Sequence, residues 1–185
     1  MKKLSGIVLI IVLAVVMIAP ANASGLALTE ERTHEGFFMR FLLGFGPGNL
    51  TFDLSGSEMK FSSSGTSFHF QIGKEIMPNL ALFGDLGGFV LTDPEVSWQG
   101  SVMTVEDVSI SSVGFGAGLT YYFMPLNVYV SGSVLLAQAS FEYDENEGES
   151  ERGPGLMLAV GKEWWVGQKW TLGVSAFVEG ARLKD

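Results

Sequence analysis

From Gly36 onward, apolar and polar side chains alternate with a period of two, which is the period of a β-strand. No segment after residue 23 shows the period of an amphipathic helix. Most of the predicted strands reach the roughly 9–11 residues that a strand needs to cross a membrane, and they exceed the ~5–6 residues usual in globular sheets. The pattern predicts seven strands, at residues 36–46, 65–74, 79–91, 107–123, 126–142, 155–165 and 169–183.

The connections between these strands alternate between long and short. Long polar segments occupy residues 48–64, 92–106 and 144–154, whereas residues 75–78, 124–125 and 166–168 form short links. Long external loops and short periplasmic turns are typical of outer-membrane barrels. The pattern therefore predicts an all-β fold, an antiparallel up-and-down transmembrane β-barrel with the topology of a meander.

Aromatic side chains gather at the ends of the strands that adjoin the short links. Amphipathic rings favour the headgroup zone of a bilayer, so this clustering predicts a girdle on the periplasmic side. In the alternative, a soluble β-sandwich, the same rings would belong to the core. The predicted girdle consists of Phe37, Tyr121, Phe123, Trp164, Trp165 and Trp170.

The two faces of each predicted strand differ in composition. One face is nearly continuous Leu, Val and Phe, and the other is mostly Gly, Ser, Ala and Thr. A face in contact with water should carry many Lys and Glu side chains, whereas small residues fit the crowded interior of a narrow barrel. We therefore expect the small-residue face to point inward and the apolar face to contact lipid, which requires the sheet to close.

The small-residue face carries about one charged or polar anchor per strand. A buried charge must be paired or neutralised, so we expect Arg40 to pair with Asp85, Glu163 or Glu179. Gln71 and Tyr129 are expected as hydrogen-bonding neighbours. We interpret the set as an internal plug that stabilises the barrel, with no catalytic role. The predicted interior network is Arg40, His69, Gln71, Asp85, Tyr129, Glu163 and Glu179.

The first 23 residues have the three parts of a secretory signal peptide. Lys2 and Lys3 are followed by an apolar run from Ile7 to Ala19, and the sequence Ala-Asn-Ala at 21–23 is a cleavage pattern. A membrane anchor is the alternative, although a span needs ~20 apolar residues. We expect a signal peptide at 1–23, a short lead at 24–35 and a barrel domain at 36–185.

Charge and composition exclude several classes of function. The 185 residues include 11 Lys and Arg against 20 Asp and Glu, a net charge of −9, which argues against nucleic acid as a partner. There is no cysteine, which excludes disulfides, thiolate metal sites and cysteine nucleophiles. Neither a cofactor nor a metal is expected. The acidic run Asp144–Glu151 does not have the spacing of a helix-loop-helix calcium site, and we interpret it as a solvated external loop.

The segments GFFMRFLLGFGPG, GAGLTYYFMP, LNVYVSGSVLLAQASFEYD and GKEWWVGQKWTLGVSAFVEGARL together resemble the small eight-stranded outer-membrane β-barrel family, which includes the barrel domain of outer membrane protein A and the X-type barrels. The resemblance covers residues 36–185. It implies export through the Sec pathway, insertion by the barrel-assembly machinery, and contact with outer-membrane lipid and lipopolysaccharide. The family uses an even number of strands, whereas seven are visible here. Either the eighth strand is truncated, which we favour, or the lead segment or a partner strand supplies it.

Three classes of function follow from this interpretation. The first, which we favour, is a non-enzymatic barrel with a structural or surface-interaction role and an unknown loop partner. The second is a narrow channel or carrier for small apolar molecules. The third is an enzyme that modifies lipid A, with Ser67 and His69 on one face and a carboxylate to orient the imidazole.

Overall fold

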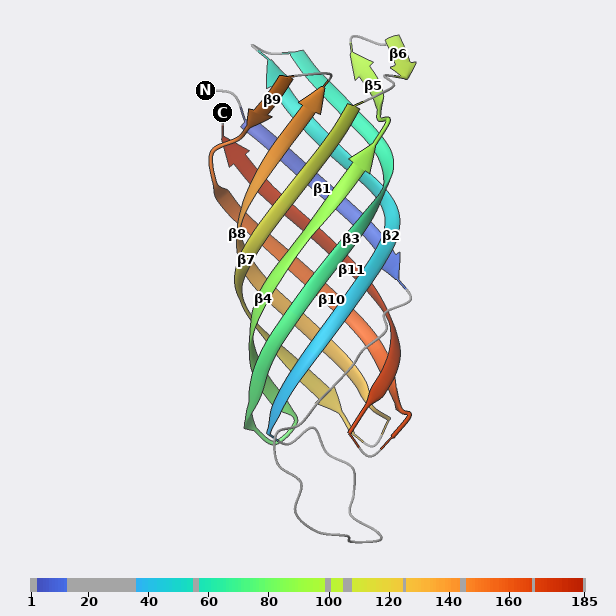
Figure 1. Ribbon diagram of the computed structural model, residues 1–185, viewed down its shortest axis with the longest axis vertical. Coiled ribbons are helices and arrows are strands. Elements are labelled where there is room, and N and C mark those ends of the chain that lie inside the picture. Colours follow the sequence, from blue (N-terminus) through green and yellow to red (C-terminus); the bar gives the residue numbers. More distant parts are fainter. Residues whose placement is uncertain are drawn as a thin grey trace, which may run out of the picture.

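The computed structural model describes residues 3–12, 36–54, 57–98, 101–104, 108–124, 126–143, 146–167 and 169–184. All regular structure in this part of the chain is β-strand, in one antiparallel sheet of eleven strands (Figure 1). The strands are β1 (Lys3–Val12), β2 (Phe37–Leu54), β3 (Ser57–Met77), β4 (Leu80–Thr92), β5 (Glu95–Trp98), β6 (Ser101–Thr104), β7 (Val108–Phe123), β8 (Val128–Tyr143), β9 (Asn146–Glu149), β10 (Gly153–Trp165) and β11 (Thr171–Lys184).

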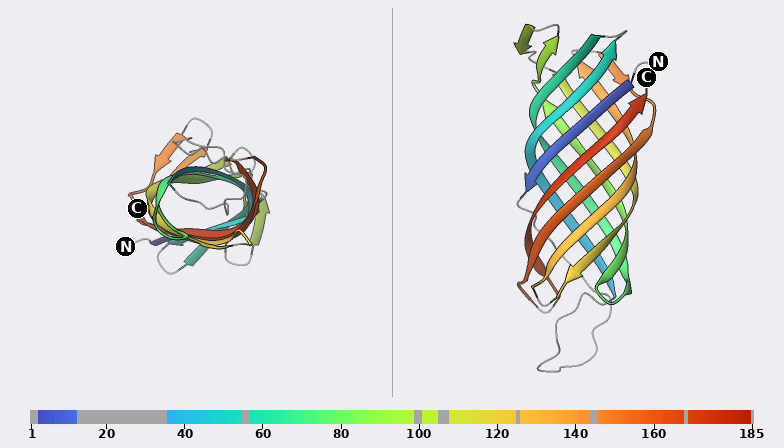
Figure 2. Two further views of the ribbon diagram at one scale, coloured as in Figure 1. Left: turned by 90° about the horizontal axis from the view of Figure 1, so that it is seen from below. Right: turned by 180° about the vertical axis from the view of Figure 1, so that it is seen from behind.

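The long strands follow one another up and down in chain order. Each of β2, β3, β4, β7, β8, β10 and β11 pairs antiparallel with the next, which confirms the seven predicted strands and the all-β class. Seen along its long axis, the sheet curves round on itself (Figure 2). We call the end with the short links the turn end and the opposite end, toward β5, β6 and β9, the loop end (Figure 1).

The predicted long loops contain more strand than expected. β2 continues to Leu54 and β3 begins at Ser57, with every residue between Gly48 and Leu54 paired across the two strands. β5 and β6 form a hairpin within the predicted loop 92–106, and β9 pairs with β8 within the predicted loop 144–154. The prediction of loops was wrong there because backbone pairing continues past the point where the composition becomes rich in Ser and Gly.

The segment Lys3–Val12, predicted to belong to a signal peptide, forms β1 in this structure. It runs antiparallel to both β11 and β2, paired over all ten of its residues with β11 and at six positions with β2. The remaining residues of the predicted signal peptide and of the lead, 1–2 and 13–35, lie outside the described residues. β1 therefore occupies the position between β11 and β2 where sequence analysis found a strand missing.

The inner face of the sheet is packed in layers. Near the turn end lie the buried rings of Phe38, Phe83 and Tyr122, and near the loop end lie Leu50 and Leu91. Polar residues occupy the level between them. The cavity beside this level has a volume of about 20 Å³, enough for about one water molecule, and glycine and alanine form most of its wall.

The outer face of the long strands carries large apolar side chains that are about half exposed. They recur at alternate positions, opposite in direction to the buried set, as the alternation predicted. Among the described residues, no helix has the length and apolar character to cross a membrane. The exposed set on the outer face includes Phe41, Leu43, Phe45, Leu82, Leu86, Val113, Phe115, Leu119, Val130, Val134, Leu156, Leu158, Val160 and Leu172.

A buried polar network as the candidate functional site

Arg40 is the centre of the polar level. Like Phe38 and Leu42, two residues to either side on β2, it points to the inner face, and its side chain has no exposed surface. The guanidinium forms an ion pair with Glu163 of β10, with 3.1 Å between Nη2 and Oε1. It also donates hydrogen bonds to the side chains of Gln71, Thr120 and Tyr122. Arg40 therefore connects four other strands of the sheet: β3, β7 and β10 directly, and β8 through the next contact.

That next contact is with an aromatic ring. The guanidinium carbon of Arg40 lies 4.3 Å from the centroid of the Tyr129 ring on β8, within the range of a cation–π interaction. Tyr129 was expected as a hydrogen-bonding neighbour, and the structure brings it to Arg40 through its ring face. The site surrounds the cation with one carboxylate, three neutral acceptors and an aromatic face.

A second cluster is built around His69 on β3. Its Nδ1 lies 3.0 Å from Asp85 Oδ1, and its Nε2 lies 3.0 Å from Glu179 Oε2. Ionised carboxylates only accept hydrogen bonds, so an imidazole held between two of them donates from both nitrogens, as an imidazolium does. Ser133 and Ser67 donate to the remaining oxygens of Asp85 and Glu179 at 2.7 and 3.0 Å.

Gln71 joins the two clusters. Its Oε1 accepts from Arg40 at 3.2 Å, and its Nε2 donates to Asp85 Oδ2 at 3.3 Å. The orientation of the amide follows from its neighbours, because one is a cation that only donates and the other is a carboxylate that accepts. The structure thus brings all seven residues of the predicted network into one connected level, with Arg40 paired to Glu163.

Glycine makes room for the network at two places. A Cβ at Gly87 would overlap the ring of His69, and a Cβ at Gly161 would lie 2.6 Å from Tyr129 Cε1. Real Cβ atoms do not approach so closely, so both rings would have to move. The small-residue face is therefore a condition for the network, since the rings of His69 and Tyr129 lie directly against glycine backbone.

The arrangement of Ser67 and His69 does not match a catalytic triad. Both side chains contact Glu179, but through different carboxylate oxygens, and the hydroxyl proton of Ser67 points to Glu179. A nucleophile needs a hydrogen bond to its base. Ser67 and His69 are also fully enclosed on the inner face. Within the described residues, no group of His, Asp and Glu is arranged to hold a metal ion.

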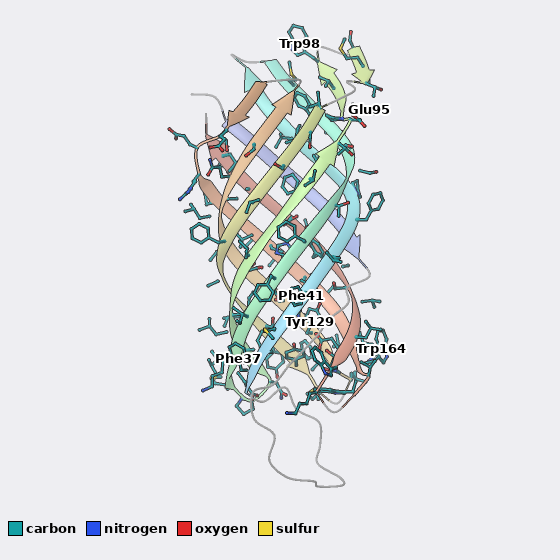
Figure 3. All side chains as sticks on the ribbon, in the orientation of Figure 1. Phe37, Phe41, Glu95, Trp98, Tyr129 and Trp164 are labelled. Atoms are coloured by element: carbon teal, nitrogen blue, oxygen red, sulfur yellow. The ribbon has the colours of Figure 1, made fainter. Side chains whose placement is uncertain are left out.

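The predicted aromatic girdle lies at the turn end, as Figure 3 shows for Phe37 and Trp164. Phe37, Tyr121, Phe123, Trp164 and Trp170 are between 40 and 49% exposed on the outer face. Trp165 differs, because it alternates with Trp164 and is half-buried on the other side. Lys162 lies next to this group, with its Nζ 5.5 Å from the centroid of the Trp164 ring.

Several members of the network were not predicted from the sequence. Thr120, Tyr122, Ser131, Ser133 and Thr171 all lie on the inner face and bond to each other or to the charged residues. The available signal was their position in the alternation along β7, β8 and β11, which places them on the inner face. Tyr122, for example, lies two residues from the buried Thr120 and so shares its face, whereas Tyr121 and Phe123 are exposed on the outer face.

No family model matches the chain, and no curated protein matches it.

Proposed function

We propose that this protein is an integral β-barrel of a bacterial outer membrane, without enzymatic activity, and with a structural or surface-interaction role. In this proposal seven long strands and an eighth at the position of β1 form a closed ring, the turn end lies in the periplasm, and the loop end faces outward. The observation that supports it most is the inversion of polarity, with charged residues buried inside and Leu, Val and Phe exposed outside.

Such an inversion of polarity is not expected in a water-soluble protein. Soluble monomers rarely expose contiguous apolar patches beyond a few hundred Å². Here, exposed apolar side chains occur on every long strand whose side chains are described, so the apolar band crosses the outer face of all seven of these strands. The aromatic group at one end fits the boundary between acyl chains and headgroups. Hydrogen bonding of both edges of each long strand fits a lipid environment, in which unpaired backbone groups are disfavoured.

Export, assembly and surroundings follow from the same proposal. The N-terminal segment would direct the chain through the Sec pathway, and the barrel-assembly machinery would insert it. Cleavage after Ala23 would remove β1, so another strand would then have to take its place between β11 and β2. Outer-membrane lipid and lipopolysaccharide would be its immediate partners. The buried network would serve as the internal plug, because its ion pairs and hydrogen bonds join strands that are not neighbours in the sheet.

The two alternative functions have less support. A channel needs a continuous path, whereas buried apolar residues lie on both sides of the polar level in the described interior. A lipid A-modifying enzyme needs a nucleophile within reach of lipid, whereas Ser67 is enclosed on the inner face. Planar-bilayer conductance and lipid A analysis test these alternatives directly.

The proposal is tested by placing one charge on the outer face. Val134, in the middle of β8, is 65% exposed, and Val102 of β6, at the loop end, is 66% exposed. In lipid, Val134→Arg should lower the free energy of unfolding by about 2–4 kcal/mol. Val102→Arg should change it by no more than about 0.5 kcal/mol, as for a water-exposed site.

The measurement is urea unfolding of protein refolded in vesicles, combined with fractionation of inner and outer membranes from cells that express the chain. Equal, small effects of the two substitutions would contradict a lipid-facing β8. Recovery of the chain in the soluble fraction would contradict the location.

A further inference from the structure

The outer face of β10 changes from apolar to cationic near the turn end. Leu158 and Val160 are 49% and 50% exposed, and Lys162 is the next residue on the same face. The pairing register places Lys162 between Val128 of β8 and Val174 of β11, so apolar residues flank it on both sides. Lys162 is therefore the first charge that follows the apolar band of this strand toward the turn end.

The ammonium group of Lys162 is held at the level of the short links. Its Nζ donates to the backbone carbonyl of Leu126, in the link between β7 and β8, and lies 5.5 Å from the centroid of the Trp164 ring. A lysine in such a position keeps its stem along apolar surface and its charge at the polar boundary. An ammonium has three N–H donors, and the carbonyl accepts from one of them, so donors remain for another acceptor.

Two tryptophans and a second lysine lie beside Lys162. Trp164 and Trp170 are 47% and 43% exposed on the outer face, and they are diagonal neighbours, because Trp164 pairs with Leu172. Lys169 precedes Trp170 in the link between β10 and β11 and is half-buried. Figure 3 shows Trp164 at the turn end. We call Lys162, Trp164, Lys169 and Trp170 the β10–β11 patch.

Within the described residues, the β10–β11 patch has no acidic side chain to neutralise it. Of the described carboxylates near the turn end, Glu163 is buried and paired with Arg40. Glu75 lies on β3, which is the fourth neighbour of β10 in the strand order. The patch therefore combines two cations with two indole N–H donors, a set that attracts an anion.

We propose that the β10–β11 patch binds the phosphate of an anionic phospholipid in the periplasmic leaflet of the outer membrane. The phosphate would accept hydrogen bonds from Lys162 and be attracted by Lys169, and the acyl chains would lie along the apolar side chains of β10 and β11. This inference rests on the proposed membrane location and names the class of lipid. A zwitterionic lipid would use the same apolar surface, but the cation of its own headgroup would offset the attraction.

The test measures which lipid contacts the two tryptophans of the patch. Phe replaces Trp98 and Trp165, and the full chain is refolded in vesicles of phosphatidylcholine. Increasing shares of phosphatidylglycerol or phosphatidylcholine with brominated acyl chains are then included, because bromine quenches tryptophan fluorescence on contact. We expect half of the full quenching at an about tenfold lower share of phosphatidylglycerol, and this preference should fall as salt is raised.

A lysine elsewhere at the turn end supplies the matched control. Lys162→Gln keeps the length of the side chain and removes its charge, so it should lower the preference for phosphatidylglycerol about fivefold. Lys162→Arg keeps the charge and should retain the preference. Lys74→Gln, at an exposed position on β3, should change the preference by no more than about twofold.

Two results would overturn the inference and leave the membrane location standing. One is equal quenching by the two brominated lipids, and the other is equal effects of Lys162→Gln and Lys74→Gln. In both cases lipid still reaches the tryptophans, so only its selection by the patch is refuted. Absence of quenching by either lipid would refute the membrane location itself, and the inference with it.

Discussion

Arg40 is the side chain whose loss should destabilise this interior most. It is fully buried, and its guanidinium forms an ion pair with Glu163 and hydrogen bonds with Gln71, Thr120 and Tyr122. Arg40→Met keeps the aliphatic part of the side chain and removes the charge. The carboxylate of Glu163 would then lie buried without its cation. Removal of one partner of a buried ion pair costs about 3–5 kcal/mol, and we expect the free energy of unfolding to fall by that amount.

A double-mutant cycle separates the pair from simple loss of packing. Glu163→Gln keeps the shape of the side chain, and in the double variant neither charge remains. The double variant should be less damaged than the sum of the single variants by about 2 kcal/mol. Lys74→Met is the control, because Lys74 is an exposed cation near the turn end, and its loss should change stability by about 0–1 kcal/mol.

The assay is urea unfolding in detergent micelles, followed by tryptophan fluorescence and by the mobility of unboiled protein on gels. Additivity within about 0.5 kcal/mol would refute the coupling between Arg40 and Glu163. An effect of Lys74→Met as large as that of Arg40→Met would show that the assay reports charge and not the buried pair.

Three further predictions use the same unfolding and gel assays. His69→Phe should lower stability by about 3 kcal/mol, since it removes the cation between two buried carboxylates; an unchanged midpoint would refute that role. Gly161→Val should cost about 1–3 kcal/mol, because its Cβ would lie 2.6 Å from a tyrosine ring, whereas Gly148→Val, in open space, should cost no more than about 0.5 kcal/mol. Residues 24–185 refolded alone should show no heat-dependent mobility shift, because two strand edges are unpaired, and a peptide of residues 1–13 should restore it; a shift without the peptide would contradict this reasoning.

The strands were predictable because period-two alternation is a local property of the chain. The ends of β2 and β3 were missed because the segment 48–64 ends in Ser-Ser-Ser at 62–64 and has the composition of a loop. Pairing between the two strands overrides that composition. For Lys3–Val12, apolar composition suits either a helix or a strand, and the two open edges of β11 and β2 decide the conformation in this structure.

The residues of the polar level were predictable, but most of their contacts were not. Alternation identifies which side chains share the inner face, whereas contacts between strands that are not neighbours depend on strand stagger and tilt, which no local pattern contains. Arg40 therefore had three carboxylates as predicted partners, and only the three-dimensional arrangement selects Glu163. Tyr122 shows the opposite case. Its position in the alternation alone would have identified it as an interior residue, although its neighbours in the sequence are exposed aromatic residues.

β1 differs from the other long strands in how it is attached. β11 and β10, or β7 and β8, are joined by a short link at the turn end, whereas β1 reaches β2 only through residues 13–36 and has no link to β11. It can therefore leave its place without opening a hairpin. Local unfolding should begin at this seam, and backbone amides of β11 and β2 that donate to β1 should exchange their hydrogens sooner than those between β4 and β7. The seam is the point at which the stability of the whole sheet depends on one separable segment.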